Sequence, residues 1–369
     1  MKKNIQIDSF EWYINNTLLG KNFLSVLKIS ESISEINSKK YAALKFDKCP
    51  LYFVGSGSSF SVAIFARDLF TFYTDMPCFV YTVYDFMNFA KPGATVFIIT
   101  QSGSTPDVLS AIQLAKKMKC EIYAISSATV KNSKKNLYKF IGQDNVFDIC
   151  CQTEDAFVNS ASPLASCFIF LEILNRHSRI IENKIFNSKK IINDLFNNSF
   201  NKILLLDIIN PINNQFVCLG SGLTSAAVNE LNLKISEAIL EDSEKSELKN
   251  FTHGRFLKTV VHHERKYFYI FFGQGKDVKL INFLKSKIKH PNIAIIRNSK
   301  IQALNSLQLF FDAIMLAVFL SYCKNKFSKD RKIFDPAIFK IPTATRDINV
   351  GFNLLKNKQR RLNNPRILI

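Results

Sequence analysis

Several features that define common protein classes are missing from this sequence. We find no segment long and apolar enough to predict a membrane-spanning helix. The N-terminal stretch MKKNIQIDSFEWY contains lysines but no apolar core, so we expect no signal peptide. The eight cysteines include no CxxC pair, which argues against a structural zinc site. Reduced thiols in the cytoplasm are the simplest interpretation.

Acidic residues are also scarce, with 30 Asp and Glu against 49 Lys and Arg, and the net charge is +19. Such an excess can indicate a nucleic-acid-binding face. Here the lysines are dispersed, no nucleic-acid motif accompanies them, and the basic cluster at 356–361 lies in the terminal tail. We attribute the charge to a lysine-, asparagine- and isoleucine-rich composition, and expect neither nucleic acid nor a membrane as a partner.

What the sequence does contain is a repeated alternation of apolar runs and helical patterns. At 369 residues and 47% hydrophobic content, it is long enough for two globular domains. Strands alternating with helices predict parallel sheets with crossover connections. We therefore predict two related α/β domains in tandem, each built on a parallel sheet. The runs expected to form strands are 51–54, 79–83, 95–99, 121–125, 215–219, 267–272 and 293–296.

Composition along the chain predicts the domain limits. A strand–Gly-Ser-Gly–helix unit occurs near residue 55 and again after Leu219, about one domain length further on. The segment between the two units is helical in pattern and rich in lysine and asparagine. The predicted limits are 1–45 for a helical lead-in, 46–170 for the first domain, 171–213 for a helical connector, 214–345 for the second domain and 346–369 for a tail.

The turn Thr100-Gln-Ser-Gly-Ser-Thr-Pro106 has the composition of an anion-binding site. It follows the apolar run 95–99 and precedes a helical pattern. A helix start offers unpaired N–H groups and a positive dipole end, and glycine lets the backbone approach a ligand closely. A nucleotide-binding P-loop would carry a lysine, and this turn has none. The turn therefore favours a small phosphate ester over a nucleoside triphosphate with magnesium.

This turn, Thr100-Gln-Ser-Gly-Ser-Thr105, and a second one, Val54-Gly-Ser-Gly-Ser-Ser59, resemble the two signature turns of the sugar isomerase (SIS) domain family. The tandem arrangement is similar to the isomerase half of glucosamine-6-phosphate synthase, to tagatose-6-phosphate ketose/aldose isomerases and to fructosamine-6-phosphate deglycases. We find no N-terminal cysteine-nucleophile domain, so we do not expect a glutamine-dependent synthase. The resemblance implies two tandem doubly wound SIS domains, each with a mostly parallel sheet of about five strands, and a homodimer with shared active sites. We expect no cofactor and no metal.

The resemblance also implies which groups hold the phosphosugar. Short hydroxyl and amide side chains beside helix starts can donate to phosphate oxygens or sugar hydroxyls. The alternative for Ser58 and Thr105 is helix N-capping alone. The implied substrate-binding residues of the first domain are Gly57, Ser58, Ser59, Thr100, Gln101, Ser102, Thr105, Val158 and Ser160.

The second domain supplies possible acid–base groups. Glu230, Lys234 and Glu237 are spaced i, i+4 and i+7, so on a helix they share one face. Glu237 matches the family's proton-shuttling carboxylate, and Lys234, also a predicted substrate-binding residue, would keep it ionised. The alternative is a solvated salt-bridge stripe without function.

Two further catalytic candidates come from the resemblance. His253 matches the family histidine that opens the sugar ring, although Arg255 stands where the family usually has proline after His-Gly. Lys340 is the candidate for a lysine that contacts the open-chain sugar. The run 262–264, His-His-Glu, suggests a metal site at first sight, but its place between strand-like runs favours a turn.

The function predicted from these residues is a phosphosugar isomerase that opens the ring and moves a proton between C1 and C2, with deamination or deglycation as a possible extension. The alternative is a non-catalytic phosphosugar-binding regulatory protein. Such proteins usually carry a helix-turn-helix, and residues 1–50 show none.

Overall fold

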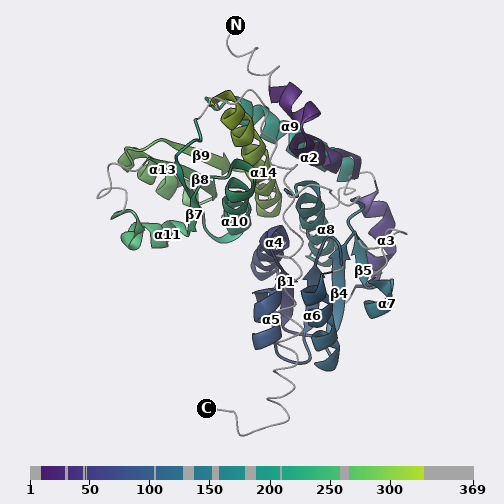
Figure 1. The fold of residues 1–369 in the computed structure, drawn as a ribbon. Coiled ribbons are helices and arrows are strands. Elements are labelled where there is room, and N and C mark those ends of the chain that lie inside the picture. Colours follow the sequence, from purple (N-terminus) through teal and green to yellow (C-terminus); the bar gives the residue numbers. More distant parts are fainter. Residues whose placement is uncertain are drawn as a thin grey trace.

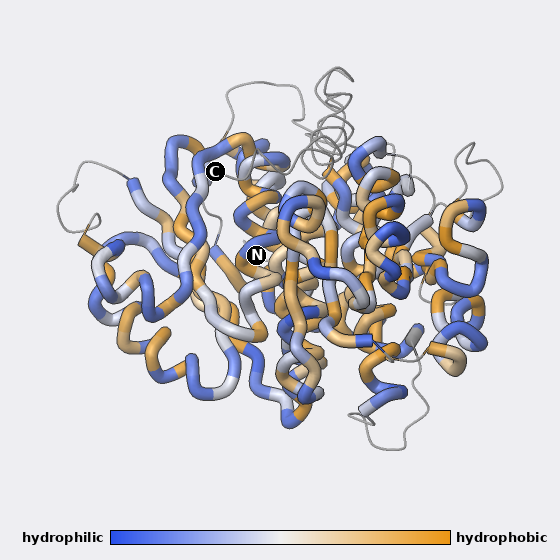
Figure 2. The backbone as a smooth tube through the Cα atoms, turned by 90° about the horizontal axis from the view of Figure 1, so that it is seen from below, coloured by the Kyte–Doolittle hydropathy of each residue, from blue (hydrophilic) through white to orange (hydrophobic). Residues whose placement is uncertain are grey.

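The computed structural model describes residues 10–29, 32–44, 46, 48–103, 105–127, 137–151, 158–178, 188–207, 210–257 and 266–327. These residues form two parallel sheets with helices packed against them (Figure 1). The predicted fold class, two α/β units in tandem, is confirmed. Along the helices in Figure 2, short hydrophobic and hydrophilic stretches follow one another, as expected where one face of each helical turn covers a sheet.

The first sheet has five parallel strands in the order β2-β1-β3-β4-β5. The central strands β1 and β3 are buried at every position, which explains their continuous apolar sequences. The strand bounds are β1 Leu51–Gly55, β2 Cys78–Thr82, β3 Thr95–Ile99, β4 Glu121–Ser126 and β5 Val146–Asp148. The helices of this unit are α4 Ser58–Tyr73, α5 Val83–Phe89, α6 Pro106–Lys117, α7 Tyr138–Ile141 and α8 Ala161–Ser178.

The second sheet has four parallel strands among the described residues, in the order β7-β6-β8-β9, where about five were expected. The strand β7, Ser243–Ser246, was not predicted, because its residues Ser-Glu-Lys-Ser carry no apolar signal. The other strands are β6 Gln215–Leu219, β8 Tyr267–Gln274 and β9 Asn292–Arg297. The helices are α10 Ser225–Lys234, α11 Leu248–Asn250, α13 Asp277–Lys287 and α14 Gln302–Phe327. π-helical turns cover Ile235–Ile239 and Phe251–Arg255.

Helices α4 and α8 of the first unit pack against α10 and α14 of the second (Figure 1). The expectation that no segment is long and apolar enough to span a membrane is wrong for helix α14, whose length and composition meet both criteria. In the fold, 94% of its most apolar window is buried. Its buried Asp312 carboxylate pairs with the Arg297 guanidinium at 2.5 Å. Helix α14 is therefore a core helix, which accounts for its apolar sequence.

The lead-in forms helices, as predicted, including α2 Leu18–Ile29 and α3 Ile33–Ala43. Both pack against α8, and α3 also covers the edge strand β5. The Asn37 side chain donates to the Asp148 carbonyl at 2.7 Å and accepts from the Asp148 N–H at 2.8 Å. The connector contains α9, Ser188–Leu204, which packs on α14. Helix α8 continues past residue 170, where the first domain was predicted to end. The domain limits therefore stay predictions.

Candidate functional site

A tight turn joins β1 to α4 and presents three serines. Gly57 has φ 59° and ψ −132°, a conformation that favours glycine. At Gly55 an added Cβ would lie 2.4 Å from the Ser59 carbonyl oxygen, so only glycine fits there. These two glycines bring the helix start directly above the end of the strand, where the Ser56, Ser58 and Ser59 side chains meet a pocket.

The second turn, after β3, is braced by the end of β4. The Gln101 carbonyl accepts hydrogen bonds from the Ser127 N–H at 3.1 Å and from the Ser127 hydroxyl at 2.6 Å. The Thr100 hydroxyl accepts from the Gly103 N–H at 3.2 Å. Helix α6 begins at Pro106, where a missing N–H costs nothing. The strand–turn–helix geometry predicted for 95–117 is thus present.

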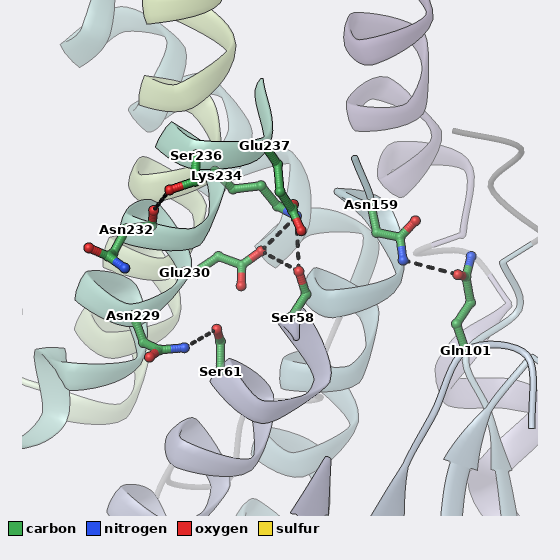
Figure 3. Close-up of polar contacts among 10 residues, drawn as sticks. All are labelled: Ser58, Ser61, Gln101, Asn159, Asn229, Glu230, Asn232, Lys234, Ser236 and Glu237. Atoms are coloured by element: carbon green, nitrogen blue, oxygen red, sulfur yellow. Dashed lines mark hydrogen bonds and ion pairs between the residues drawn. The ribbon is translucent and has the colours of Figure 1, made fainter. Parts of the chain in front are cut away.

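A small polar pocket of about 60 Å³ lies between these two turns and the start of α8. The Asn159 amide donates to the Gln101 side-chain oxygen at 3.1 Å and joins the two walls (Figure 3). The pocket is lined by Ser56, Ser58, Ser59, Val62, Ile99, Gln101, Ile149, Asn159, Ser162, Pro163 and Ser166. Hydroxyl and amide groups that converge at the carboxyl end of a parallel sheet suit an oxygen-rich anion.

The structure brings together some predicted binding residues and leaves others outside the pocket. Ser58, Ser59 and Gln101 line it, while Gly57, Thr100, Ser102, Thr105, Val158 and Ser160 do not. Val158 and Ser160 are buried on either side of Asn159, which does line it. Ser162 and Ser166 were missed, because α8 is otherwise so apolar that its sequence indicates a core helix. Their i, i+4 spacing on one face was the available signal.

Glu230, Lys234 and Glu237 come together beside this pocket, as their spacing predicted. The Lys234 Nζ lies 3.4 Å from Glu230 Oε1 and 2.9 Å from Glu237 Oε2 (Figure 3). The side chains of Lys234 and Glu230 are 1% and 0% exposed, whereas that of Glu237 is 18% exposed. The cluster is therefore buried at one end and open to solvent at Glu237, so it is not a solvated surface stripe, and the roles of its residues stay predictions.

The Ser58 hydroxyl connects the first turn to this cluster. It donates to Glu230 Oε1 at 3.0 Å and accepts from Lys234 Nζ at 2.9 Å. Figure 3 shows Ser58 between Glu230 and Glu237, on the side of α4 that faces α10. The turn of the first domain and the carboxylates of the second are thus joined within one chain.

A second contact between the same two helices fixes their register. The Asn229 amide donates to the buried Ser61 hydroxyl at 2.7 Å, and the Lys245 ammonium binds the Asn229 side-chain oxygen. Burial lowers the pKa of Lys245. Beside the cluster, the thiol of Cys167 is fully buried, and burial, with the Glu230 charge as a smaller cause, raises its pKa well above the usual range.

His253 lies on the π-helical turn Phe251–Arg255 and is exposed. Within the described part of the chain its imidazole makes no hydrogen bond. Gly254, next to it, has φ 158°, and the Arg255 guanidinium donates to the Lys245 carbonyl at 3.1 Å. Lys340, Ser104 and the run 262–264 lie outside the described residues.

The Gly-Ser-Gly turn of the second domain is filled by a carboxylate of the same chain. The Ser221 hydroxyl donates to Glu247 Oε1 at 2.6 Å, and the Asn250 N–H donates to Glu247 Oε2 at 2.7 Å. Burial opposes ionisation of Glu247, but these hydrogen bonds outweigh it and lower its pKa. At this second turn the Glu247 carboxylate of the same chain takes the place of an anion from solution.

Comparison with known families assigns the first α/β unit, which contains β1 to β5, to a family. Residues 46–150, which contain the whole five-stranded sheet and both turns, match the SIS domain family. This part of the chain is a SIS domain. No curated protein sequence matches the chain. The four-stranded unit after it repeats the strand–turn–helix arrangement of the SIS domain with a smaller sheet.

Several solved structures share this fold over most of their length. Glucosamine-6-phosphate deaminase from Thermotoga maritima is 16% identical, with a TM-score of 0.64 over 87% of this chain and 95% of that chain. Tagatose-6-phosphate ketose/aldose isomerase from Escherichia coli is 16% identical, with a TM-score of 0.64 over 89% and 97%. The C-terminal domain of glucosamine-fructose-6-phosphate aminotransferase from Francisella tularensis is 15% identical, with a TM-score of 0.52 over 81% and 96%. At these identities the likeness shows a common fold.

Proposed function

We propose that the chain is an enzyme that isomerises a sugar phosphate or amino sugar phosphate. The pocket between the two turns of the SIS domain holds the phosphate, and Glu237 is the acid–base group. One observation carries this proposal: Lys234 binds both Ser58, on the wall of the pocket, and Glu237. A substrate whose phosphate is bound in the pocket therefore has a partly exposed carboxylate beside it.

The chemistry follows from one carboxylate that reaches two carbons. In the aldose form, Glu237 removes the proton from C2 while the C1 carbonyl oxygen gains a proton, which gives an enediol. The enediol O–H at C2 then gives up its proton as the carbonyl forms there, and Glu237 returns its own proton to C1, which yields the ketose. Lys234 holds the carboxylate in its ionised form between turnovers. An amino sugar phosphate passes through an enolamine in the same way, and hydrolysis of the resulting imine releases ammonia.

His253 and Lys340 complete the proposal as the ring-opening base and a contact to the open-chain sugar. His253 is exposed in the single chain, so it suits a site that is closed by a second copy. We therefore include a homodimer with shared sites in the proposal, and light scattering tests it. All eight cysteines are free, which fits a reducing cytoplasm.

Turnover tests the enzyme proposal directly. Purified protein is incubated with fructose-6-phosphate, glucosamine-6-phosphate and fructosamine-6-phosphate, and products are followed by NMR in D₂O. We expect exchange of the C1 or C2 proton, and Glu237→Gln should slow it by about 10²- to 10⁴-fold. Glu241→Gln is the matched control, because Glu241 is a carboxylate of the same segment that pairs with Lys324 at 3.2 Å. If none of these or other hexose or pentose phosphates exchanges, the proposal is wrong.

The second candidate is a non-catalytic sugar-phosphate-binding protein. Arg255, which stands next to His253-Gly254 where the resemblance implies proline, favours it. A thermal-shift screen with sugar phosphates separates the two candidates, since binding raises the melting temperature with or without turnover. Stabilisation without proton exchange, unchanged in Glu237→Gln, would support the binding protein.

A further inference from the structure

The Glu247 carboxylate joins two elements that are separate in sequence. Oε1 accepts from the hydroxyl of Ser221 on the turn after β6, and Oε2 accepts from the N–H of Asn250 in α11. The Ser221 hydroxyl in turn accepts from the Leu248 N–H at 3.2 Å. Ser221 and Glu247 thus form a closed loop of hydrogen bonds that ties the turn to α11.

The tied segment leads directly to His253. Leu248 and Phe251 are buried, and the centroid of the Phe251 ring lies 5.8 Å from that of the Tyr269 ring on β8. Beyond Phe251 the chain becomes exposed, and His253 lies on that exposed turn. The buried side chains of Leu248 and Phe251 anchor the segment in the core, and the Glu247 hydrogen bonds hold it to the turn after β6.

We propose that Glu247 is a positioning residue that sets the place of His253 by acting as a built-in anion in the second Gly-Ser-Gly turn. This inference rests on the proposed function. It also explains why one chain would bind one sugar phosphate although it contains two related turns. The turn of the SIS domain is open to the pocket, and that of the second unit is already filled.

Hydrogen–deuterium exchange of the amides of 248–255 tests the tie without any need for activity. We expect Glu247→Ala to speed exchange there by about tenfold, the effect of losing charge-assisted hydrogen bonds. Ser221→Ala should have a similar effect, and the double variant should exchange no faster than Glu247→Ala, because the two residues act as a unit. Asp242→Ala, an exposed carboxylate just upstream, is the control. Unchanged exchange, or additive effects of the two substitutions, would overturn the proposal.

Kinetics tests the positioning role. In Glu247→Ala we expect kcat to fall at least tenfold while KM stays within twofold, since the phosphate pocket belongs to the other domain. Glu247→Asp should recover part of kcat. A rise in KM of about tenfold with an unchanged kcat would contradict the positioning role of Glu247. If the wild-type chain turns over no sugar phosphate, the proposed function fails, whereas the exchange experiment still decides whether the tie exists.

Discussion

The two Gly-Ser-Gly turns of this chain share a local sequence and differ in what they face. After β1, the serines line a pocket, and Ser58 reaches the Glu230–Lys234 pair. After β6, Ser221 donates to Glu247 of its own domain. The turn sequence therefore specifies an anion-binding geometry, and the element packed against it decides whether the anion comes from solution. Substitutions in and around the two turns test this difference.

The largest effect is expected from removing the lysine that links the first turn to the second domain. Lys234→Met leaves the fully buried Glu230 carboxylate without its cation, which should lower the free energy of unfolding by about 3–5 kcal/mol. Adding Glu230→Gln should recover much of this loss. Lys324→Met is the control, because its pair with Glu241 is partly exposed and should cost about 1 kcal/mol or less. Urea unfolding measures all three, and equal losses for the two lysines would argue against a special linking role.

The glycines of the two turns should behave alike in stability and differently in binding. Gly57 and Gly222 have φ of 59° and 53° with open space where a Cβ would be. Alanine at either position should cost about 1–2 kcal/mol of backbone strain. Only Gly57→Ala should also weaken binding of inorganic phosphate, measured by calorimetry. Weakened binding in both variants would mean that the second turn also serves the ligand.

Side-chain deletions on the two turns should separate them further. Ser59→Ala and Gln101→Ala each remove a polar group from the pocket lining, so we expect inorganic phosphate or a sugar phosphate to bind about five- to tenfold more weakly. Ser221→Ala should leave that affinity unchanged. A reversed result would place the phosphate in the second domain.

The smallest expected effect is on stability at acid pH. The pKa of Glu247 is lower in the folded chain than in the unfolded chain, so its hydrogen bonds stabilise the fold above the ordinary range near pH 4 and lose this contribution as the pH falls through the folded value. The difference in melting temperature between the wild type and Glu247→Gln should therefore shrink from about pH 7 to about pH 3. A constant difference would show that the charge of Glu247 plays no part.

The elements that are clear in the sequence are those with a continuous physical signal. Strands such as 95–99 are buried on both faces and so are apolar beyond their first residue, and the carboxylate–lysine cluster followed from its spacing. Even so, the spacing was only approximately right, because α10 ends at Lys234 and Glu237 lies on a π-helical turn. Helix periodicity alone does not reveal that change.

Other features depend on contacts between segments far apart in the chain. The direction of the Ser58 hydroxyl is set by α10, which is about 170 residues downstream. The polar strand β7 is held by its pairing with β6, and nothing in its own composition favours a strand. Glu247 has the sequence context of an ordinary surface carboxylate until the fold brings Ser221 to it. Tertiary packing decides these cases, so sequence patterns miss them.

The contact between α3 and β5 has a consequence for how copies of this chain can meet. The outward backbone groups of Val146 and Asp148 are all taken, by Gln143, by the Lys40 ammonium and by the Asn37 carboxamide. An unpaired strand edge is a template on which another molecule can add a strand and start aggregation. A strand that approached β5 would find no free donor or acceptor there. The Asn37 and Lys40 side chains of α3 thus prevent further strands from adding to this edge of the sheet, and association of this chain on that side is left to its helices.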